Sequence, residues 1–164
     1  MAVTFPEGMV LERGDQMALS IIHDAMTERP IYFASSAGMI NRLGLRPWGI
    51  RHGLAVKLVL WSLDDEDPPG VVRGSPELGG ERILMQRSLR LYHDVYAYRG
   101  LRDRPIWQDR STLNIPFQFY LVSLLLADAA RVAGLEAEMV DRLEADAADF
   151  QLVAAGGARG RPGT

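Results

Sequence analysis

The hydrophobic positions near the N-terminus follow first a helical and then an extended pattern. Over residues 16–26 apolar side chains recur at every third or fourth position, and they come after Asp15, which favours the N-cap of a helix. This spacing predicts a helix. The next apolar run, 31–34, is too short for a helix and rich in β-forming residues, so it predicts a strand. The turn-forming Ser35–Gly38 predicts the start of a short second helix that ends near Leu43.

A second strand is predicted over 55–61. The twenty residues between the two strands suffice for a crossover helix, which joins parallel strands. We therefore expect parallel pairing in a small sheet covered by helices. Because 31–34 has no polar alternation, we expect Ile31 and Phe33 to point into a packed layer, or the strand to be buried on both faces.

Residues 62–80 interrupt the apolar periodicity. Asp64–Asp67 is followed by Pro68-Pro69-Gly70 and by further glycine and proline, which predicts an exposed loop. A calcium loop needs alternating oxygen ligands around a glycine turn and a later bidentate carboxylate, and the two prolines prevent that geometry. We interpret the acidic run as solvated charge.

Helical spacing returns in the C-terminal half. It predicts a helix from Glu81 to about Tyr98, an irregular stretch over 101–110, a buried helix over 115–132 that is apolar nearly all round, and a last helix over 135–153. In the last helix one stripe is apolar: Leu135, Met139, Leu143, Ala147 and Phe150. The opposite face is acidic and is expected in water: Glu136, Glu138, Asp141, Glu144, Asp146 and Asp149.

Together these elements predict an α/β fold. A small parallel sheet with packed helices precedes a C-terminal helical hairpin that resembles one unit of a helical repeat. Residues 1–154 are expected to form a single domain with an exposed acidic loop at 62–80. The glycine-rich residues 155–164 are expected to be a flexible tail.

Composition narrows the function further. The 164 residues include no cysteine, which excludes disulfides, thiolate metal sites and cysteine nucleophiles. The formal net charge of -3 gives no general attraction to nucleic acid. The most apolar run, 115–127, is shorter than the roughly 20 residues that cross a bilayer, so we expect no transmembrane segment. The N-terminus has no basic start followed by an apolar core, so no signal peptide is expected.

Few residues indicate catalysis. Ser20, His23 and Asp24 lie within one predicted helical turn, but a nucleophilic serine needs an oxyanion hole and a base in line, usually at a strand-to-helix turn. We interpret the three as a solvated surface. His52 and His93 have no second histidine at metal-ligand spacing, and no metal or cofactor is expected.

Two further groups of residues are interpreted as structural rather than functional. Ser35–Gly38 follows a strand, where backbone amides can hold a phosphate, but no glycine-rich nucleotide motif or Walker lysine accompanies it. Trp48 and Trp61 are interpreted as filling the core margin beside the sheet.

The arginine-rich segment 99–110, which also contains Trp107, is the candidate partner surface. Arginines combined with tryptophan are typical of interface hot spots, and they also occur in loops that pack back on their own domain. Both alternatives remain open. With the arginines of the tail, the candidate partner-binding residues are Arg99, Arg102, Arg104, Trp107, Arg110, Arg159 and Arg161.

Several stretches resemble a known family. They are Asp15-Gln16-Met17, Ile21-Ile22, Arg29-Pro30-Ile31-Tyr32-Phe33-Ala34-Ser35, Leu43-Gly44-Leu45 and His52-Gly53-Leu54-Ala55-Val56-Lys57-Leu58. The pattern resembles the soluble C-terminal part of bacterial integral-membrane proteins that look like glycosyltransferases and are related to protein O-mannosyltransferases. The string Arg-Pro-Ile-Tyr-Phe-Ala is the specific piece, and weaker similarity extends through 96–100 and 114–134.

The departures from this family decide what the resemblance implies. Its multi-spanning region and membrane-embedded acidic residues have no counterpart here, and Glu28 stands where an aromatic residue is frequent. The resemblance therefore implies a tail domain detached from its enzyme. The family places this domain on the outer face of the membrane, so we expect a peripheral, periplasmic location. The missing signal peptide leaves a cytoplasmic location, or a start upstream of Met1, as alternatives.

The expected function follows from a tail domain without a catalytic group. We expect a non-catalytic, membrane-extrinsic subunit that stabilises a larger membrane protein complex, whose subunits are its partners. A photosynthetic reaction centre with its antenna is one such complex, a hypothesis that no motif supports. The alternatives are a glycan-binding accessory domain and the soluble part of a split glycosyltransferase.

Overall fold

The computed structural model describes residues 5, 8–60, 67–96, 100–101 and 110–154. The N-terminal part contains α1 (Arg13–Ala25), β1 (Tyr32–Ala34), α2 (Met39–Arg42), the 3₁₀ turn η1 (Arg46–Trp48), β2 (Gly49–His52) and β3 (Ala55–Leu58). The C-terminal part contains β4 (Val71–Arg73), the 3₁₀ turn η2 (Pro76–Leu78), β5 (Arg82–Leu84), α3 (Met85–Arg90), the π-helical turn η3 (Leu91–Val95), α4 (Arg110–Val132) and α5 (Ala137–Ala154).

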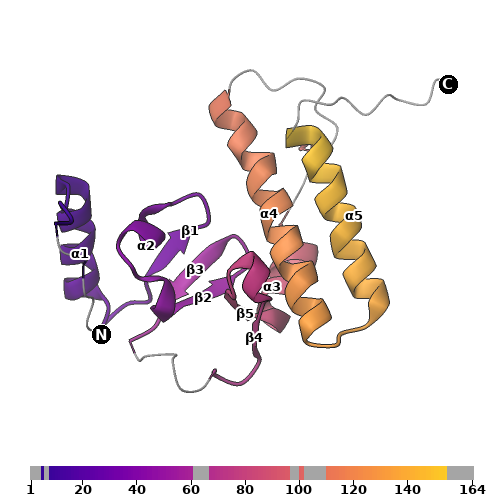
Figure 1. The fold of residues 1–164 in the computed structure, drawn as a ribbon, viewed down its shortest axis with the longest axis horizontal. Helices are drawn as coiled ribbons and strands as arrows, with labels where there is room; N and C mark the ends of the chain where they lie inside the picture. The colour runs from indigo at the N-terminus through magenta and orange to yellow at the C-terminus, as the bar shows by residue number, and fades with distance from the viewer. Residues whose placement is uncertain (1–4, 6–7, 61–66, 97–99, 102–109, 155–164) are drawn as a thin grey trace.

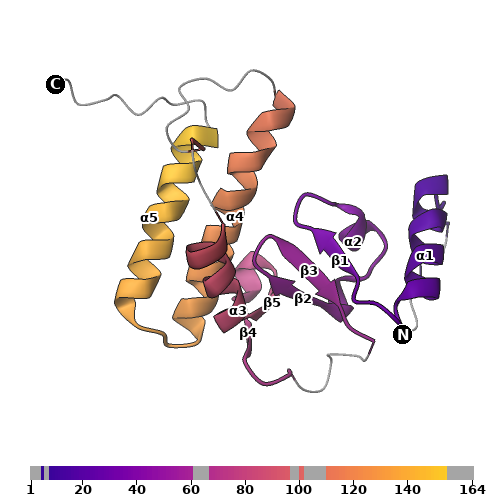
Figure 2. The ribbon, with the colours of Figure 1, turned by 180° about the vertical axis from the view of Figure 1, so that it is seen from behind.

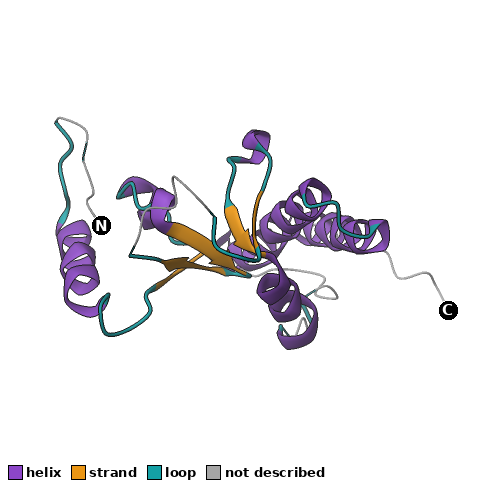
Figure 3. Ribbon diagram, turned by 90° about the horizontal axis from the view of Figure 1, so that it is seen from below, coloured by secondary structure: helices purple, strands orange, loops and turns teal. Residues whose placement is uncertain are grey.

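The architecture is mixed α/β, as the sequence predicts. The sheet lies in the middle of the molecule, α1 lies at one end, and the α4–α5 hairpin lies at the other (Figure 1). The reverse view shows the same order (Figure 2). Seen from below, α1 stands beside the sheet edge and the long helices cover the opposite side (Figure 3).

The sheet is mixed, which corrects the predicted parallel pairing. Its five strands lie in the order β1-β3-β2-β5-β4, and β1 pairs antiparallel with β3, with Phe33 opposite Val56. The error came from missing β2, which lies between β1 and β3 in the chain. Because β2 and β3 form a hairpin across Gly53-Leu54, the chain reverses its direction once more before β3, which therefore runs antiparallel to β1.

The central parallel pair joins β2 to β5, with Arg51 opposite Ile83, and β4 pairs antiparallel with β5. Both β4 and β5 were missed. Residues 71–73 fall in the predicted loop 62–80, and Arg82–Leu84 falls at the start of the predicted helix 81–98, which begins at Met85 instead. Ladder pairing outweighs the local helical spacing there.

Strand β1 is half-buried at the sheet edge. Phe33 packs with Ile31 against the cluster beneath α1, whereas Tyr32 and Ala34 are exposed. The inward orientation of Ile31 and Phe33 is therefore confirmed. The alternative, burial on both faces, is wrong because an edge strand has one covered face.

Two clusters fill the core. Beneath α1 and α2, the buried apolar residues are Ile22, Ile40, Leu43, Leu45, Val56 and Leu58. Between the sheet and the α4–α5 hairpin, the buried cluster includes Ile83, Tyr92, Phe119, Leu126, Leu143 and Phe150. The predicted margin position of Trp48 is confirmed, since its half-buried ring packs against the first cluster and against a smaller one around Ile50. Trp61 lies outside the described residues.

Helix α1 starts three residues before its predicted first residue, 16. Its N-cap is Glu12, and Asp15 accepts from the Glu12 backbone N–H at 3.1 Å in a capping box. Asp15 is 1% exposed and receives a hydrogen bond of 2.5 Å from Arg42 of α2. The residue expected to cap α1 thus also attaches it to the body.

Helix α4 is longer and less enclosed than predicted. It runs for 23 residues with Pro116 inside it. By length and composition alone, Thr112–Val132 would suffice to cross a membrane, and 44% of its apolar window is buried inside the protein. Ile115 and Phe117 are 48% and 43% exposed. The expected burial holds for 118–130, where every residue is buried or half-buried against α5, α3 and the sheet, and the exposed residues lie near the two ends of α4.

Helix α5 confirms most of the predicted stripe, since Leu143, Ala147 and Phe150 are buried. The acidic face needs a correction. Glu136, Glu138, Asp141 and Glu144 are exposed, but Asp146 is buried and Asp149 is half-buried. Residues 155–164, the predicted tail, lie outside the described residues.

Two leucines of α5 test the packing of the hairpin. Leu143 is 0% exposed and Leu152 is 52% exposed. Leu143→Ala is expected to lower the free energy of unfolding by about 3 kcal/mol, through lost transfer energy and a cavity. The same substitution at Leu152 is expected to change it by less than about 0.5 kcal/mol. Chemical denaturation measures both, and equal losses would contradict the packing of α5.

Candidate functional site

The described part of the structure does not include the side chains of the predicted partner-binding residues. Arg110 is the first residue of α4, and its side chain is outside the described part of the chain. The others lie outside the described residues altogether: Arg99, Arg102, Arg104, Trp107, Arg159 and Arg161. Their role in partner binding stays a prediction.

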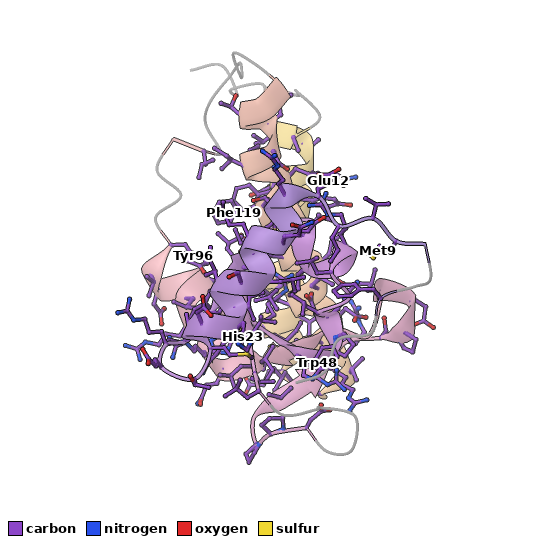
Figure 4. The ribbon with its side chains drawn as sticks, turned by 90° about the vertical axis from the view of Figure 1, so that its left-hand side faces the viewer. Met9, Glu12, His23, Trp48, Tyr96 and Phe119 are labelled. Atoms are coloured by element: carbon purple, nitrogen blue, oxygen red, sulfur yellow. The ribbon has the colours of Figure 1, made fainter. Side chains whose placement is uncertain are left out.

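The serine, histidine and aspartate of α1 are all exposed. Within the described residues no hydrogen bond joins Ser20, His23 and Asp24 to one another. Figure 4 looks onto this end of the molecule, with Glu12 at the start of α1 and His23 near its end. The geometry agrees with a solvated helix surface.

The two other histidines each contact the ring of a tyrosine. His52 is 7% exposed and meets Tyr32 edge-on, with ring centroids 5.7 Å apart. His93 meets Tyr92 edge-on at 5.6 Å. Across the described residues, no three histidine or carboxylate side chains gather as metal ligands.

A charged pair lies inside the protein next to the centre of the sheet. The side chains of Arg51 and Glu81 are 7% and 9% exposed. Arg51 Nε donates to Glu81 Oε2 at 2.8 Å, and Nη2 donates to Glu81 Oε1 at 2.9 Å. The pair is bidentate, the geometry in which arginine binds a carboxylate most strongly.

The remaining nitrogen of Arg51 joins two turns. Nη1 donates to Ser35 Oγ at 2.6 Å and to the Gly53 carbonyl oxygen at 3.0 Å. Gly53 in turn donates its backbone N–H to Ser88 Oγ at 3.0 Å. A single guanidinium therefore connects the turn after β1, the β2–β3 turn and the residue before β5.

The β2–β3 turn requires glycine at position 53. Its φ of +61° is unfavourable for side chains, and a Cβ there would lie 2.5 Å from the Tyr96 hydroxyl oxygen. That hydroxyl accepts the Leu54 backbone N–H at 3.1 Å. The turn that presents a carbonyl to Arg51 is thus held by Ser88 of α3 and by Tyr96, the residue after η3.

A cleft of about 370 Å³ opens beside the Arg51–Glu81 pair, and we call it the arginine cleft. Its lining residues come from the turn after β1 and α2, from η1 and β2, from one residue of β3, from the turn before β5 with the start of β5, and from one residue of α4. Its polar and charged lining residues are Ser35, Asn41, Arg46, Arg51, Glu81 and Arg82, and Leu125 reaches it from α4.

The three arginines of the cleft differ in their partners. Arg51 is bound to Glu81, and Arg82 Nε donates to Asp67 Oδ1 at 2.8 Å. Arg46 is exposed, and no acidic side chain pairs with it in the part of the chain that the structure describes. Its guanidinium lies over Gly79, where a Cβ would come within 3.0 Å of Nη2.

Asp67 corrects the interpretation of the acidic run as solvated charge. Its carboxylate is 22% exposed and also receives a hydrogen bond of 2.5 Å from Arg73 Nε. Partial burial raises the pKa of Asp67, but the hydrogen bonds and charges of Arg73 and Arg82 outweigh it and lower the pKa below its ordinary value. Residues 64–66 lie outside the described residues.

Sequence reasoning considered Ser35–Gly38 as an anion site but favoured a structural role for it, and it missed Arg46, Arg51, Arg82 and Glu81. Gly38 begins α2, a helix of four residues that is too short for a phosphate site of its own. Arg51 carries no sequence signal because an arginine within Gly49–His52 gives neither apolar alternation nor a motif. The cleft offers cations and a hydroxyl without a histidine in its lining, which suits binding better than proton transfer.

Comparison with known proteins adds no assignment. No family model matches the chain, and no curated protein or solved structure matches it significantly.

His52 predicts a stability that falls in acid. Burial, followed by the charges of Arg87 and Lys57, lowers its pKa from 6.5 to about 4, and Nδ1 has no hydrogen-bond partner among the described groups. The unfolded chain therefore binds the proton more tightly. The contribution of His52 to the free energy of unfolding is fully present above pH 6.5 and is lost as the pH falls toward 4. At pH 5 the loss amounts to roughly 2 kcal/mol.

His52→Phe keeps an aromatic ring beside Tyr32 and removes the titrating group. We expect the difference in unfolding free energy between pH 7 and pH 5 to shrink by roughly 2 kcal/mol in this variant. Denaturant titrations at both pH values measure it. An unchanged pH dependence would show that His52 does not titrate as its burial requires.

Proposed function

We propose that this protein is a non-catalytic, membrane-extrinsic subunit that stabilises a larger membrane protein complex. The observation that carries the proposal is the apolar surface of α1 and the residues before it, which we call the α1 surface: Val10, Met17 and Ile21. These side chains are 85%, 66% and 57% exposed. Met17 and Ile21 are four residues apart, so they share one side of the helix.

The position of the α1 surface supports docking. Helix α1 is at one end of the molecule, where a partner can reach it without meeting the sheet or the long helices (Figure 1). The capping box and the Asp15–Arg42 pair hold α1 on the body, so the apolar side chains are presented in a fixed orientation. Grouped exposed apolar side chains are typical of interaction sites, and methionine is enriched in interfaces.

The other end of the molecule offers a second apolar area. Ile115 and Phe117 of α4 are exposed beside the start of that helix. The resemblance to a detached tail domain of a membrane enzyme supports the same function, with a periplasmic location and a photosynthetic reaction centre with its antenna as one hypothesis for the complex. Arg99–Arg110 and the tail remain candidate contacts.

A second candidate function is a glycan-binding accessory domain or the soluble part of a split glycosyltransferase. The arginine cleft favours it, because its size and polar lining suit a small ligand.

Membrane retention tests the assembly function. The full chain is expressed in its native cell, membranes are solubilised mildly, and the chain is captured with its partners. We expect a stable complex of fixed stoichiometry with integral-membrane subunits. Replacing Met17 and Ile21 by glutamine is expected to lower the retained amount at least about tenfold, because buried apolar anchors carry most interface energy.

A matched control places two glutamines at exposed apolar positions away from α1, at Val132 in the last turn of α4 and at Leu135 in the turn after it. These side chains are 58% and 39% exposed and do not belong to the α1 surface, so retention should equal that of the unmodified chain. Equal loss in both variants would count against the α1 surface. Recovery of the unmodified chain alone would contradict the assembly function itself.

A further inference from the structure

The arginine cleft is a preformed cavity that the assembly function does not use. Its volume of about 370 Å³ lies at the small end of the range for ligand pockets, about 300–1,000 Å³. Its walls come from five separate parts of the chain and include the buried Arg51–Glu81 pair. The two hydrogen bonds of this pair fix the Arg51 and Glu81 side chains relative to one another.

The charges in the cleft leave one cation available. Glu81 neutralises Arg51 with both carboxylate oxygens, so that neither adds much to the field at the cleft. Asp67 binds Arg82. Arg46 has no acidic partner among the described residues, and a guanidinium presents its donors in a planar fork that matches carboxylate and phosphate oxygens.

Ser35 supplies a second donor. Its Oγ accepts a hydrogen bond of 2.6 Å from Arg51, so the hydroxyl proton is directed elsewhere and can be donated. The amide of Asn41 is an exposed donor in the same lining. A guanidinium, a hydroxyl and an amide around one cavity form a donor set suited to an oxyanion.

Gly79 and Gly80 shape the remaining wall. Gly79 has φ +86° and no side chain, so Arg46 lies flat against its backbone. At Gly80 a Cβ would meet no atom within 4 Å, which leaves that wall open to a ligand. Residues with larger side chains would occupy the space of the cleft.

We propose that the arginine cleft binds an oxyanion, the phosphate or carboxylate group of a sugar-sized ligand. Arg46 makes the charged contact, and Ser35 and Asn41 donate hydrogen bonds. This site gives chemical content to the second candidate function and does not depend on docking through the α1 surface. The isolated full chain suffices to test it, so failure of membrane retention and failure of ligand binding are separate results.

The test measures binding of three probes to the full chain at constant ionic strength: inorganic phosphate, glucuronate and glucose. Amide chemical shifts in NMR titrations report the affinity and the place of binding. We expect saturable shifts around the arginine cleft with phosphate, glucuronate or both, and much weaker ones with glucose. Phosphate alone would identify a phosphorylated ligand, and glucuronate alone would identify a uronic acid.

Arg46→Gln is expected to weaken binding of the anionic probes by about tenfold or more, because it removes a charge-assisted hydrogen bond. Arg46→Lys retains the charge but not the planar fork of donors. Its affinity for the anionic probes should lie between those of the unmodified chain and Arg46→Gln. The control is Arg142→Gln, at an exposed arginine of α5 away from the cleft. Absence of saturable binding by both anions, equal binding of glucose, or unchanged affinity in Arg46→Gln would overturn the proposal.

Discussion

Arg51 brings a full positive charge inside the protein, where removing a guanidinium from water costs several kcal/mol unless its charge and its donors are matched. Glu81 matches the charge and accepts two hydrogen bonds, and Ser35 and Gly53 accept the two from Nη1. These partners come from three different turns. Each of the three turns must therefore lie where its acceptor can reach the planar guanidinium of Arg51.

This requirement links the two halves of the sheet. Strands β2 and β5 share a short parallel ladder with Arg51 opposite Ile83, and Glu81 stands just before β5. The ion pair therefore reinforces the junction where the hairpin of β2 and β3 meets the strands β4 and β5. The same pair forms one wall of the arginine cleft, so the fold and the candidate binding site share one structural cause. The apolar α1 surface, by contrast, depends on Asp15 and Arg42 at the far end.

The sequence predicted those elements whose local pattern agrees with their tertiary environment. Helix α5 has apolar residues at helical spacing, and Leu143 and Phe150 are buried as that spacing requires. The prediction from sequence failed for strands that form only through pairing with residues distant in the chain. Val71–Arg73 lies between prolines and glycines, and Arg82–Leu84 continues into a helix, so neither shows a strand pattern until its ladder partner is known. The missed β2 also reversed the predicted direction of β3.

The candidate site was less predictable than the fold. Ser35 could be singled out because it follows a strand and begins a turn. The importance of Arg51, Glu81 and Arg46 lies in their partners, which are distant in sequence: Arg51 and Glu81 are 30 residues apart. A charge is usually solvated, and no local signal distinguishes a buried, paired arginine from an exposed one.

A double-mutant cycle on the Arg51–Glu81 pair is the most direct test. Chemical denaturation gives the free energy of unfolding for Arg51→Met, Glu81→Met and the double variant. Each single change leaves a buried charge unpaired and is expected to cost about 3–5 kcal/mol, whereas the double variant should cost less than the sum by about 2 kcal/mol or more. Additive costs within about 0.5 kcal/mol would contradict the claim that this pair holds the two halves of the sheet together.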